Sequence, residues 1–197
     1  MTLVDTYLAG LREALPAEQL NALKHAHGAS VADLQRLTER YPLAPASLLE
    51  LLGRIDGTHC RDYPEGRVMV LVLGSDVFEY PYYLSSVDQI LEERDTYTRS
   101  IAQIYAGYLD EIPELAGPGI DMTLGMHERL CFSHCMNNGG SSKLYIDFNP
   151  VTGGNVGQVV RYLHDPDSYK VIAPDFDHYL QQLIDDQYAF VFEDEDD

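Results

Sequence analysis

The chain is poor in several residue types. It has no tryptophan, only three cysteines, and only 13 lysines and arginines among 197 residues. An odd number of cysteines without regular spacing is not the pattern of a disulfide framework, so we expect a reducing compartment, by default the cytoplasm. The longest apolar runs, such as residues 68–73, are far shorter than the roughly 20 residues of a membrane-spanning helix. Residues 1–15 carry Asp5, Arg12 and Glu13 and do not have the pattern of a signal peptide.

Acidic residues, in contrast, are abundant. Aspartates and glutamates number 32 against 13 basic residues, which gives a formal net charge of −19, and residues 193–197 are all acidic. Such a charge repels phosphate backbones, so we expect no binding of nucleic acid. The same field attracts a basic protein and speeds its docking. Solubility alone is the alternative explanation, because acidic surfaces are common.

The first third of the chain has the apolar spacing of helices. Residues 1–36 carry apolar residues three and four positions apart, interrupted near Pro16 and Gly28, and are predicted to form a helical extension. A further leucine-rich helix is expected to end near Gly57. Residues 67–73 form an apolar run of the β type, which we expect to be buried on both faces. A long helix is predicted at about 86–110, after a capping box made by Ser86 and Gln89.

The second half has the pattern of a β-meander. Strands are predicted at residues 130–136, 144–149 and 157–163, separated by glycine-rich turns, and a closing helix is expected to begin after its cap, Asp175. In LYIDFN (144–149) apolar and polar residues alternate, so the two sets should face opposite sides of a sheet. This order predicts an α+β fold, with a mostly antiparallel sheet packed against helices. We expect one domain at 37–190, preceded by the extension at 1–36 and followed by an acidic tail at 191–197.

The stretch LYIDFNPVTGGNVGQVVRYLHDPDSYKVIAPDFDHYL (144–180) resembles the SUKH superfamily, of the Smi/Knr type. The matching pieces are a strand that ends in Asp147, a Gly-Gly turn at 153–154, the strand GQVV at 157–160, and VIAP before a helix that begins at Phe176. Residues 41–57, YPLAPASLLELLGRIDG, are similar to the helical entry motif of that family. These positions define a fold: the two glycines, for example, permit positive φ in a tight turn.

The resemblance implies a protein-binding role without catalysis. Bacterial members look like immunity proteins that block toxins, many of them nucleases, whereas fungal members resemble regulators of cell-wall synthesis with long disordered extensions. Because such extensions are not seen here, the immunity role is our expectation, and a regulatory adaptor of the fungal type is the alternative. A basic protein, such as a nuclease toxin, is the partner that a net charge of −19 suits.

A small metal-dependent enzyme is the rival hypothesis. His127, Cys131, His134 and Cys135 lie within nine residues (127–135), and all have side chains that bind zinc. If residues 130–136 form one extended strand, Cys131 and Cys135 share one face about 13 Å apart and His134 points to the other, so one ion cannot reach them all. We therefore expect no metal, no cofactor and no catalytic residue.

Tyrosines and acidic residues near position 80 are the predicted binding surface. The predicted partner-binding residues are Asp76, Glu79, Tyr80, Tyr82, Tyr83 and Asp147. Tyrosines with acidic neighbours suit a basic partner, because aromatic residues are enriched in interfaces. The alternative is that the tyrosines cover an edge of the sheet as part of the core. For Asp147 the alternative is capping of the turn that follows it. The sequence leaves the oligomeric state open.

Overall fold

Six antiparallel strands form the central sheet of the computed structural model, which describes residues 1–192. In spatial order five of them are β3 (Tyr83–Leu84), β5 (Ser133–Asn137), β6 (Gly140–Asp147), β7 (Gln158–Leu163) and β8 (Ser168–Ala173), and β4 (Leu130–Cys131) pairs with β6 in line with β5. A separate hairpin consists of β1 (Arg61–Tyr63) and β2 (Gly66–Val68). The predicted α+β class with a mostly antiparallel sheet is confirmed.

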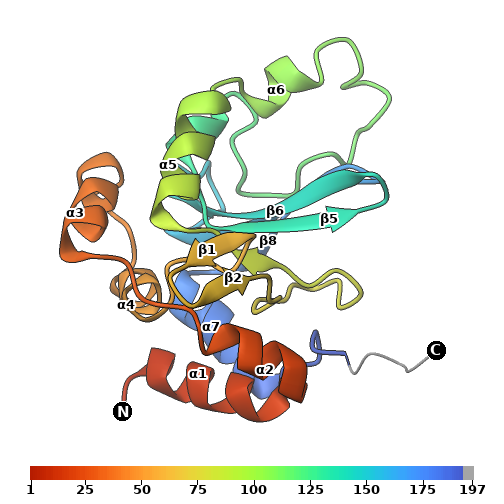
Figure 1. The fold of residues 1–197 in the computed structure, drawn as a ribbon. Coiled ribbons are helices and arrows are strands. Elements are labelled where there is room, and N and C mark those ends of the chain that lie inside the picture. The colour runs from red at the N-terminus through yellow and green to blue at the C-terminus, as the bar shows by residue number, and fades with distance from the viewer. Residues whose placement is uncertain (193–197) are drawn as a thin grey trace.

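Helices cover both sides of the sheet. They are α1 (Leu3–Ala14), α2 (Ala17–Leu23), α3 (Val31–Arg40), α4 (Ala46–Arg54), α5 (Val87–Thr96), α6 (Ile101–Ile104) and α7 (Phe176–Asp185), with a 3-10 turn η1 at Met126–Glu128. Figure 1 shows α1, α2 and α7 on one side of the sheet, and α5 and α6 on the other. The segment that follows α6 arches over the sheet on the side of α5.

The main core lies between the sheet and α7. Leu144 and Ile146 of β6 are completely buried in it, and each such side chain contributes about 1.5–3 kcal/mol relative to an exposed one. Phe132 packs edge-on against Phe176 of α7, with ring centroids 5.3 Å apart. On the outer side of α7, Leu8 and other residues of α1 complete the same core. The core therefore fixes the side of the sheet that faces α7.

Side-chain caps fix where the helices begin, as the sequence predicts. Ser86 Oγ accepts a hydrogen bond from the backbone N–H of Gln89 at 3.2 Å, and Gln89 Oε1 accepts from the N–H of Ser86 at 2.9 Å. Asp175 accepts from the N–H of His178 at 2.8 Å. Such caps satisfy donors that have no partner within the helix, so the starts of α5 and α7 are set locally.

The helix predicted at about 86–110 is wrong in length. α5 ends at Thr96, and α6 begins after a second capping box, made by Ser100 and Gln103. Between them the backbone of Tyr97 leaves the helical region, with φ −105° and ψ 80°. Residues 96–98, Thr-Tyr-Thr, have low helix propensity, so the apolar periodicity continues across a break.

The apolar run at 67–73 also differs from the prediction. Only its first part belongs to β2, and beyond it Val70 is 1% exposed whereas Met69 is 52% exposed. The expectation of burial on both faces is therefore wrong. Leu73 and Tyr82 exchange backbone hydrogen bonds of 3.0 and 2.8 Å, so the segment runs beside the residues that lead into β3.

The predicted glycine turns are present, but the two glycines at 153–154 act differently. Asn138 and Gly139 form the turn between β5 and β6, with φ of 47° and 81°. Gly153 has φ of 97°, whereas a Cβ added at Gly154 would stand 2.7 Å from the carbonyl oxygen of Gly119. Gly154 is therefore needed for close packing and not for a left-handed backbone.

The helices of the predicted extension pack on the rest of the chain. α1 contacts α4 and α7, and the hydroxyl of Tyr188 donates to the carbonyl of Tyr7 at 2.9 Å. The division into an extension at 1–36 and a domain at 37–190 stays a prediction. Of the acidic tail predicted at 191–197, residues 193–197 lie outside the described residues.

Candidate partner-binding face

One row of side chains crosses the sheet on the side of α5 and α6. Tyr83 of β3 lies opposite His134 of β5, and Lys143 of β6 lies opposite Tyr162 of β7, which in turn lies opposite Tyr169 of β8. His134 and Lys143 line the same cavity and so join the two halves of the row. We call these five residues the cross-strand row. Each has a long apolar body and a polar end, unlike the residues that face α7.

Two cavities open over the cross-strand row. One has a volume of about 300 Å³, lies between α5 and the strands β5 and β6, and is called here the α5 cavity. The other has a volume of about 210 Å³ and is called the tyrosine cavity, because its lining includes Tyr97, Tyr105, Tyr145, Tyr162 and Tyr169. Tyr97 and Lys143 line both cavities and mark the place where they meet. Concave, partly apolar surfaces of this size are typical of binding sites.

An ammonium group sits where the two cavities meet. Lys143 is only 9% exposed, and its Nζ lies 2.5 Å from Glu93 Oε1 of α5. The same Nζ lies 4.2 Å from the centre of the Tyr97 ring. A cation over an aromatic face is attracted by the ring quadrupole. Lys143 is thus held both by charge and by an aromatic ring.

Stacked rings form the floor of the α5 cavity. The His59 ring lies 4.2 Å from the His134 ring and 5.1 Å from the Tyr83 ring. Burial, together with the nearby His59 and Lys143, lowers the pKa of His134 to about 4, so its ring is neutral at neutral pH. Burial also lowers the pKa of His59. The Nδ1 atom of His134 is buried without a hydrogen-bond partner within residues 1–192.

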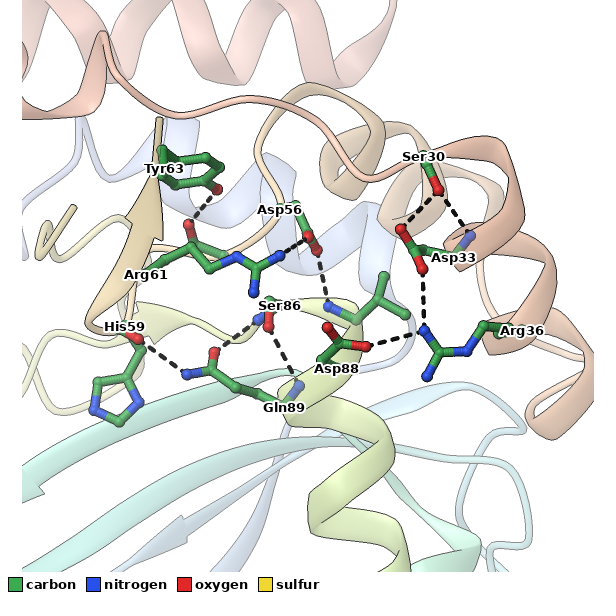
Figure 2. Close-up of polar contacts among 12 residues, drawn as sticks. Ser30, Asp33, Arg36, Asp56, His59, Arg61, Tyr63, Ser86, Asp88 and Gln89 are labelled. Carbon is green, nitrogen blue, oxygen red and sulfur yellow. Dashed lines mark hydrogen bonds and ion pairs between the residues drawn. The ribbon is translucent and has the colours of Figure 1, made fainter. Parts of the chain in front are cut away.

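A polar network ties the start of α5 to neighbouring segments of the chain, as Figure 2 shows. One carboxylate oxygen of Asp56, at the end of α4, accepts from the N–H of Val87 at 2.9 Å, and the other lies 2.7 Å from Arg61 of β1. The side chain of Gln89 donates to the carbonyl of His59 at 2.9 Å. The first turn of α5 and the histidine beneath it are therefore fixed to the same network.

Three residues that line the tyrosine cavity, Tyr105, Tyr162 and His164, are held by the carboxylate of Asp167. The hydroxyls of Tyr105 and Tyr162 both donate to Asp167, the second at 3.1 Å, and His164 Nδ1 lies 3.2 Å from the same carboxylate. Burial, together with the bond to Asp167, raises the pKa of Tyr105 well above its ordinary value. The rings of Tyr162 and Tyr169 stack with centroids 4.7 Å apart. The tyrosines are thus fixed, protonated donors with apolar faces.

A β-bulge sets which residues reach the α5 cavity. Cys131 pairs with Tyr145, whereas Cys135 pairs with Ser142, so three residues on one strand oppose two on the other. As a result Cys131 and His134 both line the α5 cavity, and Cys135 packs in the main core. The expectation that Cys131 and Cys135 share a face with His134 on the other is therefore wrong.

The histidines and cysteines of residues 127–135 do not all line one cavity: His127 lines a different cavity from Cys131 and His134, and Cys135 packs in the main core. Burial raises the pKa of Cys131 to about 12, so its thiol stays protonated and is a poor nucleophile. Ser133 Oγ accepts the backbone N–H of Leu144 at 2.8 Å. Within residues 1–192, no group of three or more His, Cys, Asp or Glu side chains is placed to hold a metal ion.

Comparison with known protein families decides the assignment. The sequence model of the SMI1 / KNR4 family (SUKH-1) matches residues 28–182, well over half of the chain. The chain belongs to this family. The matched range includes the whole sheet, the cross-strand row and most of α7. A comparison with curated proteins returns no match.

SUKH domains are in general immunity or regulatory proteins that act by binding other proteins and are not enzymes. This SUKH-1 chain has, within its described residues, no helix long and apolar enough to cross a bilayer. All three of its cysteines are free.

Of the tyrosines predicted to bind a partner, Tyr83 alone belongs to the cross-strand row. Tyr82 has no exposed surface and packs in the main core, which agrees with the alternative of a core role, and its role in binding a partner stays a prediction. Tyr80 is half-buried, and its hydroxyl accepts from the amide of Asn138 at 3.2 Å. Glu79 is exposed next to it.

The two aspartates predicted to bind a partner have partners within this SUKH-1 fold. Asp147 has no exposed surface, accepts from the N–H of Asn149 at 3.1 Å, and lies 3.4 Å from the buried Arg129. The bond to Asn149 agrees with the alternative of turn capping, and a role of Asp147 in binding a partner stays a prediction. Asp76 lies 2.6 Å from Arg161, which is buried on β7. Sequence reasoning missed both arginines, because nothing local marks an arginine as buried.

Proposed function

We propose that this SUKH-1 chain is an immunity protein that binds a toxin and blocks it without any catalytic activity of its own. The observation that carries the proposal is the cross-strand row, an aromatic and polar row beneath two cavities, in a domain whose family acts through protein binding. Side chains of this kind suit an interface, because they contribute contact area and still present a polar end.

The proposed partner is a basic protein, with a nuclease favoured. A net charge of −19 attracts such a partner, and a nuclease needs a basic groove for its own substrate. The sequence-predicted residues that we retain as contacts are Asp76, Glu79, Tyr80 and Tyr83, since each keeps exposed surface. The proposed location is the cytoplasm, which agrees with three free cysteines.

Two linked experiments test the proposal. The purified chain is used as bait in an extract of its native cell at low salt, and bound protein is released by raising salt. We expect one basic protein to be released, because salt screens attraction between exposed charges. That protein is then produced in a test host with and without this chain, and growth is followed.

Growth arrest by the captured protein, relieved by this chain, would support the immunity role. A captured protein that is harmless alone would favour a regulatory adaptor instead. Repeated capture of nothing specific would contradict protein binding as the function.

A further inference from the structure

The α5 cavity already holds one cation of the chain itself. The Lys143 ammonium lies 2.5 Å from Glu93 and 4.2 Å from the centre of the Tyr97 ring. This pair of contacts, a carboxylate on one side and an aromatic face on the other, is the environment that proteins use to hold ammonium and guanidinium groups. The geometry of the cavity therefore suits a basic side chain.

A second carboxylate in the cavity is left without a cation. Glu92 lines the α5 cavity next to Glu93, is exposed, and takes part in no ion pair within residues 1–192. His59 and His134 do not supply the missing positive charge, because burial lowers the pKa of both rings. At neutral pH the cavity therefore combines two carboxylates with one ammonium and stays net negative.

Aromatic surface is also left uncovered. Tyr97 is 52% exposed although Lys143 contacts its ring. It belongs to the lining of both cavities, so a side chain that enters the α5 cavity meets this ring as well as Glu92. A carboxylate without a cation and an exposed ring thus line the same opening.

We propose that the α5 cavity receives an arginine or lysine side chain from a loop of a basic protein partner, seated between Glu92 and Tyr97. This inference deepens the proposed function and rests on it for the class of partner. The charge of −19 draws a basic loop toward the molecule, and the cavity gives one of its side chains a specific place. Lys143 fixes Glu93 and leaves Glu92 for the incoming group.

The test uses a hexa-arginine peptide as the probe and the full chain as its receptor. Titration calorimetry is run at about 0.15 M salt, where the Debye length of about 8 Å suppresses distant charges. Glu92→Gln and Tyr97→Ala are each expected to weaken binding by about three- to thirty-fold, the range of a cation–π or charged contact. Tyr97→Phe keeps the ring and is expected to bind as the wild type does.

Matched controls separate the cavity from the general negative field. Glu13→Gln removes one exposed carboxylate from α1, and Tyr108→Ala removes a tyrosine that is 60% exposed but lines neither cavity. Each is expected to change affinity by less than about twofold, as for a single exposed charge. Circular dichroism of every variant verifies the fold, and the amide and side-chain NMR signals of Lys143 are expected to shift on binding.

Equal weakening by the cavity variants and their controls would overturn the proposal, because binding would then be diffuse. Tight binding of hexa-glutamate would also overturn it. Binding of the captured partner distinguishes this inference from the proposed function. If Glu92→Gln and Tyr97→Ala still bind that partner with wild-type affinity, the α5 cavity is not the binding site. The proposed function of binding that partner would still stand. Loss of partner binding in these two variants alone would support both.

Discussion

On the α7 side of the sheet, Leu144 and Ile146 of β6 are completely buried in an aliphatic and aromatic core. Their neighbours on the same strand, Lys143 and Tyr145, point to the other side, toward α5 and the tyrosine cavity. The two sets come from the same strand and differ only in the alternation of its side chains. On the α7 side the helices cover these two residues completely, and a cavity of about 420 Å³ lies at the rim, between α7 and Ile172 of β8. The α5 side retains two cavities.

This difference separates the part of the chain that determines the fold from the part that can vary with a partner. Apolar side chains in a close-packed core tolerate little change in volume. On the α5 side Tyr83, Tyr97, His134 and Tyr162 keep part of their surface exposed, whereas Lys143 and Tyr169 are buried. Mutations on the two sides should therefore affect different properties: stability on the α7 side, and binding on the α5 side.

The largest expected effect comes from Phe132→Ala on the α7 side. The ring has no exposed surface and packs edge-on against Phe176 and Tyr179, so its removal leaves a cavity and should lower the free energy of unfolding by about 3–5 kcal/mol. Urea denaturation measures this. Phe132→Leu, the control, should lose clearly less. A loss below that of Tyr97→Ala on the other side would contradict the comparison.

A smaller loss is expected when the β-bulge is altered by Ser133→Ala. The Oγ atom accepts the buried N–H of Leu144, and an unsatisfied buried donor costs about 1–3 kcal/mol. Urea denaturation again gives the free energy of unfolding. Ser141→Ala on β6, which removes a hydroxyl that makes no hydrogen bond within residues 1–192, serves as the control and should be near neutral. If both variants lose the same stability, the hydroxyl of Ser133 does not support the bulge.

A pH-dependent effect is expected from His134. Its pKa in the folded protein, about 4, lies below the ordinary value of 6.5, so the unfolded chain binds more protons between these values. The contribution of His134 to stability is therefore complete above pH 6.5 and is lost as the pH falls toward 4. The urea midpoint should fall more steeply between these limits for the wild type than for His134→Gln. Parallel curves would show that the ring is not desolvated.

The smallest change in stability is expected from Tyr97→Ala. The residue is 52% exposed, so its removal should lower the free energy of unfolding by less than about 1 kcal/mol. The same variant should lose affinity for a basic probe, which calorimetry measures. A large loss of stability would mean that Tyr97 belongs to the core, and the two sides of the sheet would then not differ as described.

Local signals predicted much of the fold. The capping pairs at Ser86 and Asp175 marked the starts of α5 and α7, and the alternation in residues 144–149 gave the correct face for β6. The sequence also contains a signal for the end of α5. Ser100 and Gln103 repeat the capping box of Ser86 and Gln89, which indicates that a new helix begins there. β8 and the β1–β2 hairpin were not predicted, since their short runs lack clear alternation.

The candidate site was less accessible to sequence reasoning. Of the five residues of the cross-strand row, only Tyr83 was predicted from the sequence to bind a partner. The others lie on β5, β6, β7 and β8, and their meeting depends on strand register, which no single segment specifies. His134 was moreover assigned to the wrong face relative to Cys131, because the pattern of residues 130–136 does not reveal the bulge.

The extra residue between Cys131 and Cys135 also has a consequence for other members of the family. The strand pairs with β6 on both sides of this residue, so removing it would restore regular alternation and would leave the imidazole of His134 on the cavity side and the thiol of Cys135 in the core. The helices and the order of strands would stay as they are. What a deletion removes is the position of Ser133 in the cavity lining, so a change of one residue at this point reshapes the cavity while the rest of the architecture is inherited intact.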